Sequence, residues 1–230
     1  MVLHYAKVGS VQGYILEAYQ NDFSKHALLW LQDSGLIRKV VMVTAGRVPL
    51  KAYEEIKSFK LYHLDIGLLR YMSELSPSSI IDSHVSADTP SSHCKCASTT
   101  VIMYSIQRIC RVEKTAIFKE FKGALTEQFV LQELALCPEI RNLYYWTSPA
   151  TAEVDFLFDY MGHVIPVEAK AGVAVHAQSL TQFRKKYQPG VEIITSLRNL
   201  NYRDGILNLP LVLLWNLAYY LNSVFEIPRV

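Results

Sequence analysis

The residues best suited to chemistry are an aspartate, two glutamates and a lysine in the second half of the chain. Asp155 lies in a run, residues 153–159, in which polar and apolar side chains alternate. Alternation with a period of two predicts a strand with one apolar face and one acidic face. The expected apolar face consists of Val154, Phe156 and Phe158, and the expected acidic face of Glu153, Asp155 and Asp159.

Glu168 and Lys170 lie two residues apart in a second strand-like run, residues 164–170. Residues two apart point to the same side of a pleated strand, so their carboxylate and ammonium groups are expected side by side. The three residues that separate the two strands, 160–162, are few enough to close a hairpin. We therefore expect Asp155 and Glu168 to come within reach of each other across a strand pair.

Glu127 adds a third carboxylate from a helix. It shares a stripe with Leu131 and Leu134, at i, i+4 and i+7, and such a stripe faces the core. Hard divalent cations such as Mg²⁺ prefer oxygen ligands, so Glu127, Asp155 and Glu168 are the predicted metal ligands. Lys170 beside them could polarise a metal-bound water or stabilise the charge that develops on a phosphate.

The elements expected to position these residues follow the order αβββαβ, with one more strand and helix after it. Pro138 and the pair Pro189-Gly190 are placed to end the two helices. The expected helices cover residues 125–136 and 178–187, and the expected strands cover 143–147, 153–160, 163–169, 191–195 and 211–214.

The first part of the chain predicts a different module. Helical spacing extends from 11 to 31 and Gly35 is placed to end it, after which residues 39–43 and 59–64 are strand-like. A helix followed by a β-hairpin resembles a winged-helix module. The chain then becomes rich in Ser, Thr and Pro, which is typical of a connecting loop.

These patterns predict an α/β (α+β) protein in three parts. Residues 1–76 form a partial winged-helix-like domain, 77–118 an irregular linker or insertion, and 119–230 the domain that carries the candidate site.

Asp155, followed after twelve residues by Glu168-Ala169-Lys170 and preceded by a helical glutamate, resembles the PD-(D/E)XK nuclease signature. The αβββαβ order agrees with the restriction-endonuclease-like core of that superfamily. The resemblance implies that Asp155 and Glu168 hold Mg²⁺, that Lys170 assists the attacking water, and that Glu127 is an accessory ligand.

Longer stretches resemble the C-terminal half of a large prokaryotic family of AAA+ ATPases, a half described as a domain of unknown function with a restriction-endonuclease-like fold. The similarity covers most of the chain. The stretches are 22–26, 30–37, 49–50, 59–62, 65–69, 121–127 and 154–156.

The chain departs from that family in three ways. No G-x-x-x-x-G-K-[ST] motif occurs, so we expect neither binding nor hydrolysis of ATP, and an ATPase would be a separate subunit. The helical segment between 26 and 29 is shorter than usual in the family. Residues 83–118 have no counterpart, which indicates a truncated or rearranged member.

Composition limits the remaining possibilities. Half of the 230 residues are apolar, enough for a sizeable core, and 23 Lys and Arg nearly balance 21 Asp and Glu. Any nucleic-acid contact must therefore be local. Four cysteines without a secretory signal predict a reduced, cytoplasmic protein. The apolar stretch 207–224 is interrupted by Pro210 and three asparagines, so no membrane partner is expected.

Several motifs have simpler alternatives. Arg184, Lys185 and Lys186 are candidate contacts for DNA or RNA, or an ordinary basic helix end. The aromatic runs 144–146 and 215–220 are expected to be core rather than base-stacking platforms. His93, Cys94 and Cys96 could be ligands of a soft metal ion, but Cys110 and Cys137 do not supply the second ligand pair that a zinc site needs. We therefore interpret the cysteines as thiols in a loop.

Two functions remain open from the sequence. One is a Mg²⁺-dependent, nuclease-like domain that hydrolyses phosphodiesters. The other is a non-catalytic module that binds nucleic acid or protein, a remnant of an ATPase, because one fold can carry many functions.

Overall fold

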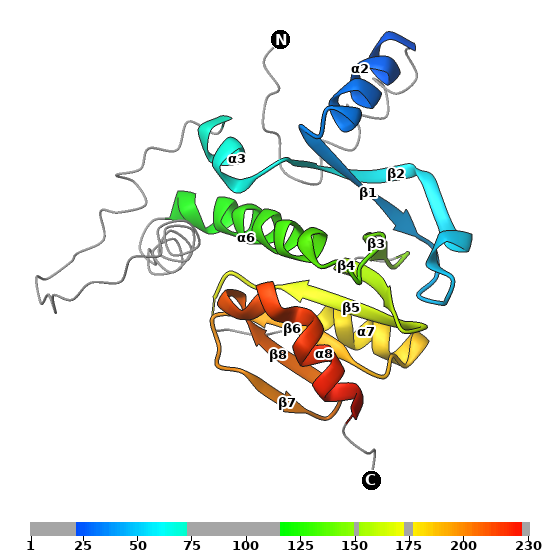
Figure 1. The fold of residues 1–230 in the computed structure, drawn as a ribbon, viewed down its shortest axis with the longest axis vertical. Coiled ribbons are helices and arrows are strands. Elements are labelled where there is room, and N and C mark those ends of the chain that lie inside the picture. The colour runs from blue at the N-terminus through cyan, green and yellow to red at the C-terminus, as the bar shows by residue number, and fades with distance from the viewer. Residues whose placement is uncertain (1–21, 73–115, 150–151, 173–176, 227–230) are drawn as a thin grey trace, which may run out of the picture.

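The computed structural model describes residues 22–72, 116–149, 152–172 and 177–226 (Figure 1). Most of the expected linker, with His93, Cys94, Cys96 and Cys110, lies outside these ranges, as does the first half of the helix expected over residues 11–31.

The described residues form a mixed α/β structure around one sheet of eight strands, ordered β2-β1-β3-β4-β5-β6-β8-β7 (Figure 1). β1 pairs antiparallel with β2 and parallel with β3, so the N-terminal hairpin extends the same sheet that carries the later strands. β4 and β5 form the antiparallel hairpin, and β5, β6 and β8 run parallel. The strands are β1 (Ile37–Val43), β2 (Glu54–His63), β3 (Tyr144–Thr147), β4 (Glu153–Tyr160), β5 (His163–Ala169), β6 (Glu192–Ser196), β7 (Asn201–Arg203) and β8 (Ile206–Pro210).

Helices cover both faces of this sheet. α6 and α8 lie on one face and α7 on the other (Figure 1), and each face has its own apolar cluster. Leu131 and Leu134 of α6 pack with Phe156 and Ile165, whereas Leu180 of α7 packs in the second cluster. The helices are α2 (Asp22–Asp33), α3 (Ile66–Met72), α6 (Ala116–Leu136), α7 (Gln178–Tyr187) and α8 (Leu217–Glu226), with short 3-10 helices η1 (Leu50–Tyr53) and η2 (Leu211–Asn216).

Local signals explain where several elements end. Gly35 adopts a φ of 75° after α2, and the backbone N–H of Leu36 donates to the carbonyl of Leu31, which closes the helix as expected. Met161 and Gly162 both have positive φ values, 51° and 78°, which suits a two-residue hairpin turn between β4 and β5. The predicted hairpin is thus confirmed.

The element order from α6 to β6 is αβββαβ, as expected, but three local predictions are wrong. α6 begins at Ala116 rather than near 125. Residues 211–214 form η2 instead of a strand, because the strand ends at Pro210. The strict alternation in β4 also fails, for Val154 packs in the α7 cluster and Phe156 in the α6 cluster.

A β-bulge explains the broken alternation. Trp146 pairs with Val154 but Tyr144 pairs with Leu157, so two steps along β3 match three steps along β4. β4 therefore has one residue more than β3 in this stretch, and the bulge lies at Asp155 and Phe156. Bulges beside functional sites commonly redirect a side chain, and this one changes the direction of the candidate aspartate.

None of the helices in the described ranges has the length and apolar character needed to cross a bilayer.

Candidate functional site

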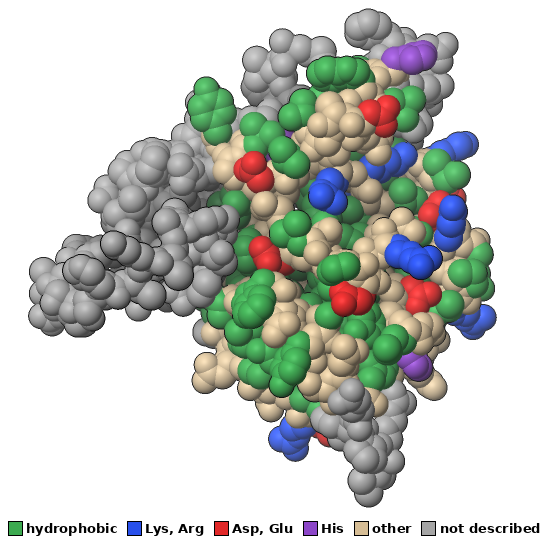
Figure 2. Space-filling view, viewed as in Figure 1, with side chains coloured by type: hydrophobic (Ala, Val, Ile, Leu, Met, Phe, Trp, Pro, Cys, Tyr) green, Lys and Arg blue, Asp and Glu red, His purple; other side chains and the backbone are tan. Residues whose placement is uncertain are grey.

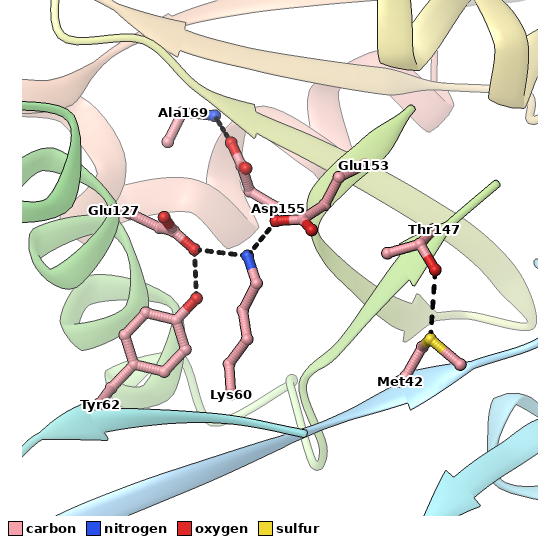
Figure 3. A network of polar contacts seen from close by, with 8 residues as sticks. All are labelled: Met42, Lys60, Tyr62, Glu127, Thr147, Glu153, Asp155 and Ala169. Atoms are coloured by element: carbon pink, nitrogen blue, oxygen red, sulfur yellow. Dashed lines mark hydrogen bonds and ion pairs between the residues drawn. The ribbon is translucent and has the colours of Figure 1, made fainter. Parts of the chain in front are cut away.

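Lys60 lies at the centre of the candidate site, although the sequence did not single it out. It extends from β2, and its Nζ lies 2.9 Å from Glu127 Oε1 and 2.5 Å from Glu153 Oε1 (Figure 3). Its side chain is only 11% exposed, and its Nζ lies 5.2 Å from the centre of the buried Tyr145 ring. One ammonium group therefore joins a carboxylate of α6 to a carboxylate of β4.

The environment favours the charged form of Lys60. Burial alone lowers its pKa, but Glu127, Glu153 and Asp155 act in the opposite direction and together raise the pKa above its ordinary value. Lys60 is therefore a cation at neutral pH.

α6 holds β2 in place through further side chains. The hydroxyl of Tyr62 donates to the same Oε1 atom of Glu127 that Lys60 contacts (Figure 3). The buried Gln128 amide donates to the His63 carbonyl and accepts from the His63 N–H, at 2.9 and 3.1 Å. Burial and the Glu127 carboxylate raise the pKa of Tyr62 well above its usual value, so its hydroxyl stays a donor.

Asp155 lies where the pairing of β4 and β5 gives way to a side-chain contact. Its Oδ2 accepts a hydrogen bond of 2.8 Å from the backbone N–H of Ala169 (Figure 3). Burial is the largest cause that raises the pKa of Asp155, and the nearby carboxylates of Glu127 and Glu168 raise it further. Asp155 is thus an acid surrounded by other acids, as sites that bind cations often are.

Glu168 and Lys170 form a pair next to Asp155. Lys170 Nζ donates to Glu168 Oε1 at 2.7 Å, and the Glu168 side chain is 5% exposed. The second oxygen, Oε2, is buried and has no hydrogen-bond partner among the described residues. Burial raises the pKa of Glu168 despite the opposing effect of Lys170. An unpaired buried carboxylate oxygen calls for a partner.

We refer to these side chains together as the carboxylate cluster. It consists of Glu127, Glu153, Asp155 and Glu168 with Lys60 and Lys170. Within the described ranges, four carboxyl groups face two ammonium groups, so the ammonium groups balance at most two of the four carboxylate charges. Among the described residues, no three His, Cys, Asp or Glu side chains are already arranged to hold a metal ion. The donor chemistry and the unpaired Glu168 oxygen fit a divalent cation, whereas the arrangement of Glu127 fits Lys60.

The structure therefore brings Glu127, Asp155, Glu168 and Lys170 into one region. Lys60, Tyr62 and the role of Glu153 were missed. Lys60 and Tyr62 are two residues apart on one strand, so they share a face, but nothing in their spacing points to a carboxylate 67 residues away.

The basic residues of α7 lie elsewhere. Arg184 makes two hydrogen bonds to the buried Glu192, from Nε at 2.7 Å and from Nη2 at 2.5 Å. Lys186 Nζ lies 5.8 Å from the Trp146 ring, and Lys185 is exposed. Arg184 thus has a structural partner, while Lys185 and Lys186 remain candidate contacts for nucleic acid.

The surface shows no concentration of positive charge on the face drawn in Figure 2. There the described Lys and Arg side chains are interspersed with Asp and Glu. The aromatic run 144–146 is buried as expected, but Trp215 and Tyr219 are 66% and 61% exposed. The expectation of core is wrong for these two, because the turn from η2 into α8 directs Leu214 and Leu217 inward instead.

Two family models match the chain. Residues 3–79 match a domain of unknown function (DUF8612), and residues 122–214 match another domain of unknown function (DUF4143). DUF4143 is often found in AAA-ATPase-associated proteins. No curated protein and no solved structure matches the chain. Lys60 lies in the first matched segment and the other residues of the carboxylate cluster in the second, so the two segments meet at the candidate site.

Proposed function

We propose that this chain is a nuclease-like domain that binds a divalent cation in the carboxylate cluster and acts on phosphodiesters. The observation that carries the proposal is the excess of carboxyl over ammonium groups around Asp155, together with the buried Oε2 of Glu168, which has no hydrogen-bond partner among the described residues. A buried charge without a counterion is costly, and a cation would remove that cost. The order α6-β3-β4-β5-α7-β6 supports a restriction-endonuclease-like core.

The residues of the carboxylate cluster would have different roles in binding the cation and the substrate. Asp155 and Glu168 are the ligands with free capacity, and Glu127 is an accessory ligand. Lys170 orients Glu168 through its 2.7 Å contact, and its 28% exposed side chain offers positive charge to a phosphate. A divalent cation such as Mg²⁺ would supply Lewis-acid activation of water. No residue here is proposed to bind ATP.

Calorimetric titration with Mg²⁺ and with Mn²⁺ tests the site. Wild type is expected to bind, and Asp155→Asn and Glu168→Gln are expected to lose binding because each removes a ligand charge. Asp159→Asn is the matched control, since Asp159 lies on the same strand and is exposed. Cleavage of single-stranded DNA, duplex DNA and RNA with either cation then tests activity.

Absence of cation binding by wild type, or binding that Asp155→Asn leaves unchanged, contradicts the metal site. Binding without cleavage of any of the three nucleic acids contradicts the enzymatic part alone.

A second function is favoured by one specific contact. Lys60 already forms ion pairs with Glu127 and Glu153, so the cluster also suits a non-catalytic module that binds nucleic acid or a separate ATPase subunit. DNA binding that weakens with salt and persists in Glu168→Ala would support this module. Loss of DNA binding in Glu168→Ala, with the fold intact, would count against it.

A further inference from the structure

Lys60 is the one residue of the carboxylate cluster that comes from the N-terminal hairpin. Its side chain is 11% exposed, and its ammonium contacts Glu127 and Glu153 at 2.9 and 2.5 Å. Both contacts are as short as charge-assisted hydrogen bonds in proteins. A cation that used Glu127 would have to share or displace this ammonium.

Several features keep Lys60 where it is. Tyr62 donates to the same oxygen of Glu127, and Gln128 fixes the end of β2 through two hydrogen bonds to His63. The ammonium also lies 5.2 Å from the centre of the Tyr145 ring, within the range of a cation–π contact. The position of the charge is therefore set by α6, β2 and β3 together.

We propose that Lys60 is the resident cation of the carboxylate cluster and that it competes with a divalent cation for Glu127 and Glu153. The inference rests on the proposed function, and it deepens that function by naming the residue that controls occupancy. Asp155 and Glu168 are available to a divalent cation, but the wild-type site binds it weakly because Lys60 occupies Glu127 and Glu153. Because Lys60 belongs to the hairpin, cation binding is coupled to how β2 sits against α6.

Titration of the full chain with Mn²⁺ alone, followed by calorimetry, tests the competition. Lys60→Met is expected to bind Mn²⁺ about tenfold or more tightly than wild type, since a repelling charge is gone and Glu127 is released. Lys60→Arg keeps the charge and is expected to bind as weakly as wild type. Lys57→Met is the matched control, because Lys57 is an exposed lysine on the same strand.

Thermal denaturation without metal tests whether Lys60 stabilises the fold as the counterion of Glu127 and Glu153. In the presence of chelator, Lys60→Met is expected to lower Tm by about 4 °C or more, because Glu127 and Glu153 lose their counterion. In a Glu127→Gln background, Lys60→Met should lower Tm by clearly less. Lys60→Gln serves if Lys60→Met does not fold.

The outcomes separate this inference from the proposed function. Binding by wild type that Lys60→Met leaves unchanged or weakens overturns the competition and leaves the metal site standing. Binding that appears only in Lys60→Met supports the resident cation and contradicts the proposed function, because wild type then binds no divalent cation. Equal losses of Tm in both backgrounds overturn the ion pair with Glu127. Absence of Mn²⁺ binding in every variant overturns both the competition and the metal site.

Discussion

The molecule contains two regions in which buried carboxylates meet basic side chains, and they differ in how completely the charges are matched. On the α7 side, one guanidinium, Arg184, donates to both oxygens of the 2% exposed Glu192. In the carboxylate cluster, four carboxyl groups share two ammonium groups, and one oxygen of Glu168 has no hydrogen-bond partner among the described residues. The first region is closed, whereas the second has capacity left for a ligand.

This difference indicates which charged groups stabilise the fold. A bidentate pair satisfies both partners, so it needs nothing more from outside the chain. Crowded carboxylates destabilise a folded protein, and such features are typical of sites kept for function. Removing the guanidinium of Arg184 should therefore destabilise the fold, whereas removing a carboxylate from the carboxylate cluster should stabilise it.

The largest expected change in stability is at the pair of Arg184 and Glu192. Arg184→Met leaves Glu192 buried without its cation, so the free energy of unfolding should fall by about 2 kcal/mol, less than for a fully buried pair because the Arg184 side chain is 43% exposed. Urea denaturation measures this. Arg203→Met is the control, since its pair with Asp204 is over 80% exposed at both ends, and it should change little. Equal effects of the two variants would remove the contrast.

The opposite sign is expected in the carboxylate cluster. Asp155→Asn removes a carboxyl group whose ionisation is opposed by burial and by neighbouring carboxylates, and it keeps the shape, so without metal the free energy of unfolding at pH 7 should rise by about 1 kcal/mol. The same denaturation experiment measures it, with Asp159→Asn as control. A loss of stability like that of Arg184→Met would show that Asp155 supports the fold.

The pH dependence sharpens the same contrast. Folding raises the pKa of Asp155 above 3.8, so the folded state binds its proton more tightly than the unfolded state. The resulting stabilisation is complete below the ordinary pKa and is lost as pH rises through the raised pKa. From about pH 4 upward, wild type should lose stability relative to Asp155→Asn, measured by denaturation at each pH. A difference that stays constant with pH contradicts the raised pKa.

The smallest expected effect is at the end of α7. Lys186→Met removes an ammonium group that lies over the Trp146 and Tyr187 rings, so the free energy of unfolding should fall by about 0.5 kcal/mol. Lys185→Met is the control and should change less. If both variants instead weaken DNA binding and reduce its salt dependence, the basic helix end is a phosphate contact.

Much of the sheet around the site could be predicted from local sequence. The strands β4 and β5 and the helix α7 lie where their patterns place them, because periodicity and the turn at Met161-Gly162 act over a few residues. The bulge at Asp155 could not be predicted, since it depends on how β3 pairs with β4. The strand expected at 211–214 was wrong because an apolar run alone does not separate a strand from a buried 3-10 turn.

The sequence by itself determined the ligand types and the strands that carry them, because Asp155, Glu168 and Lys170 lie on neighbouring elements. Only the tertiary structure decided the charge balance. Lys60 reaches Glu127 and Glu153 because β1 pairs with β3 and α6 binds the end of β2, contacts between segments far apart in the chain. Electrostatic energy depends on distance in space, so a counterion brought in by long-range pairing leaves no local pattern.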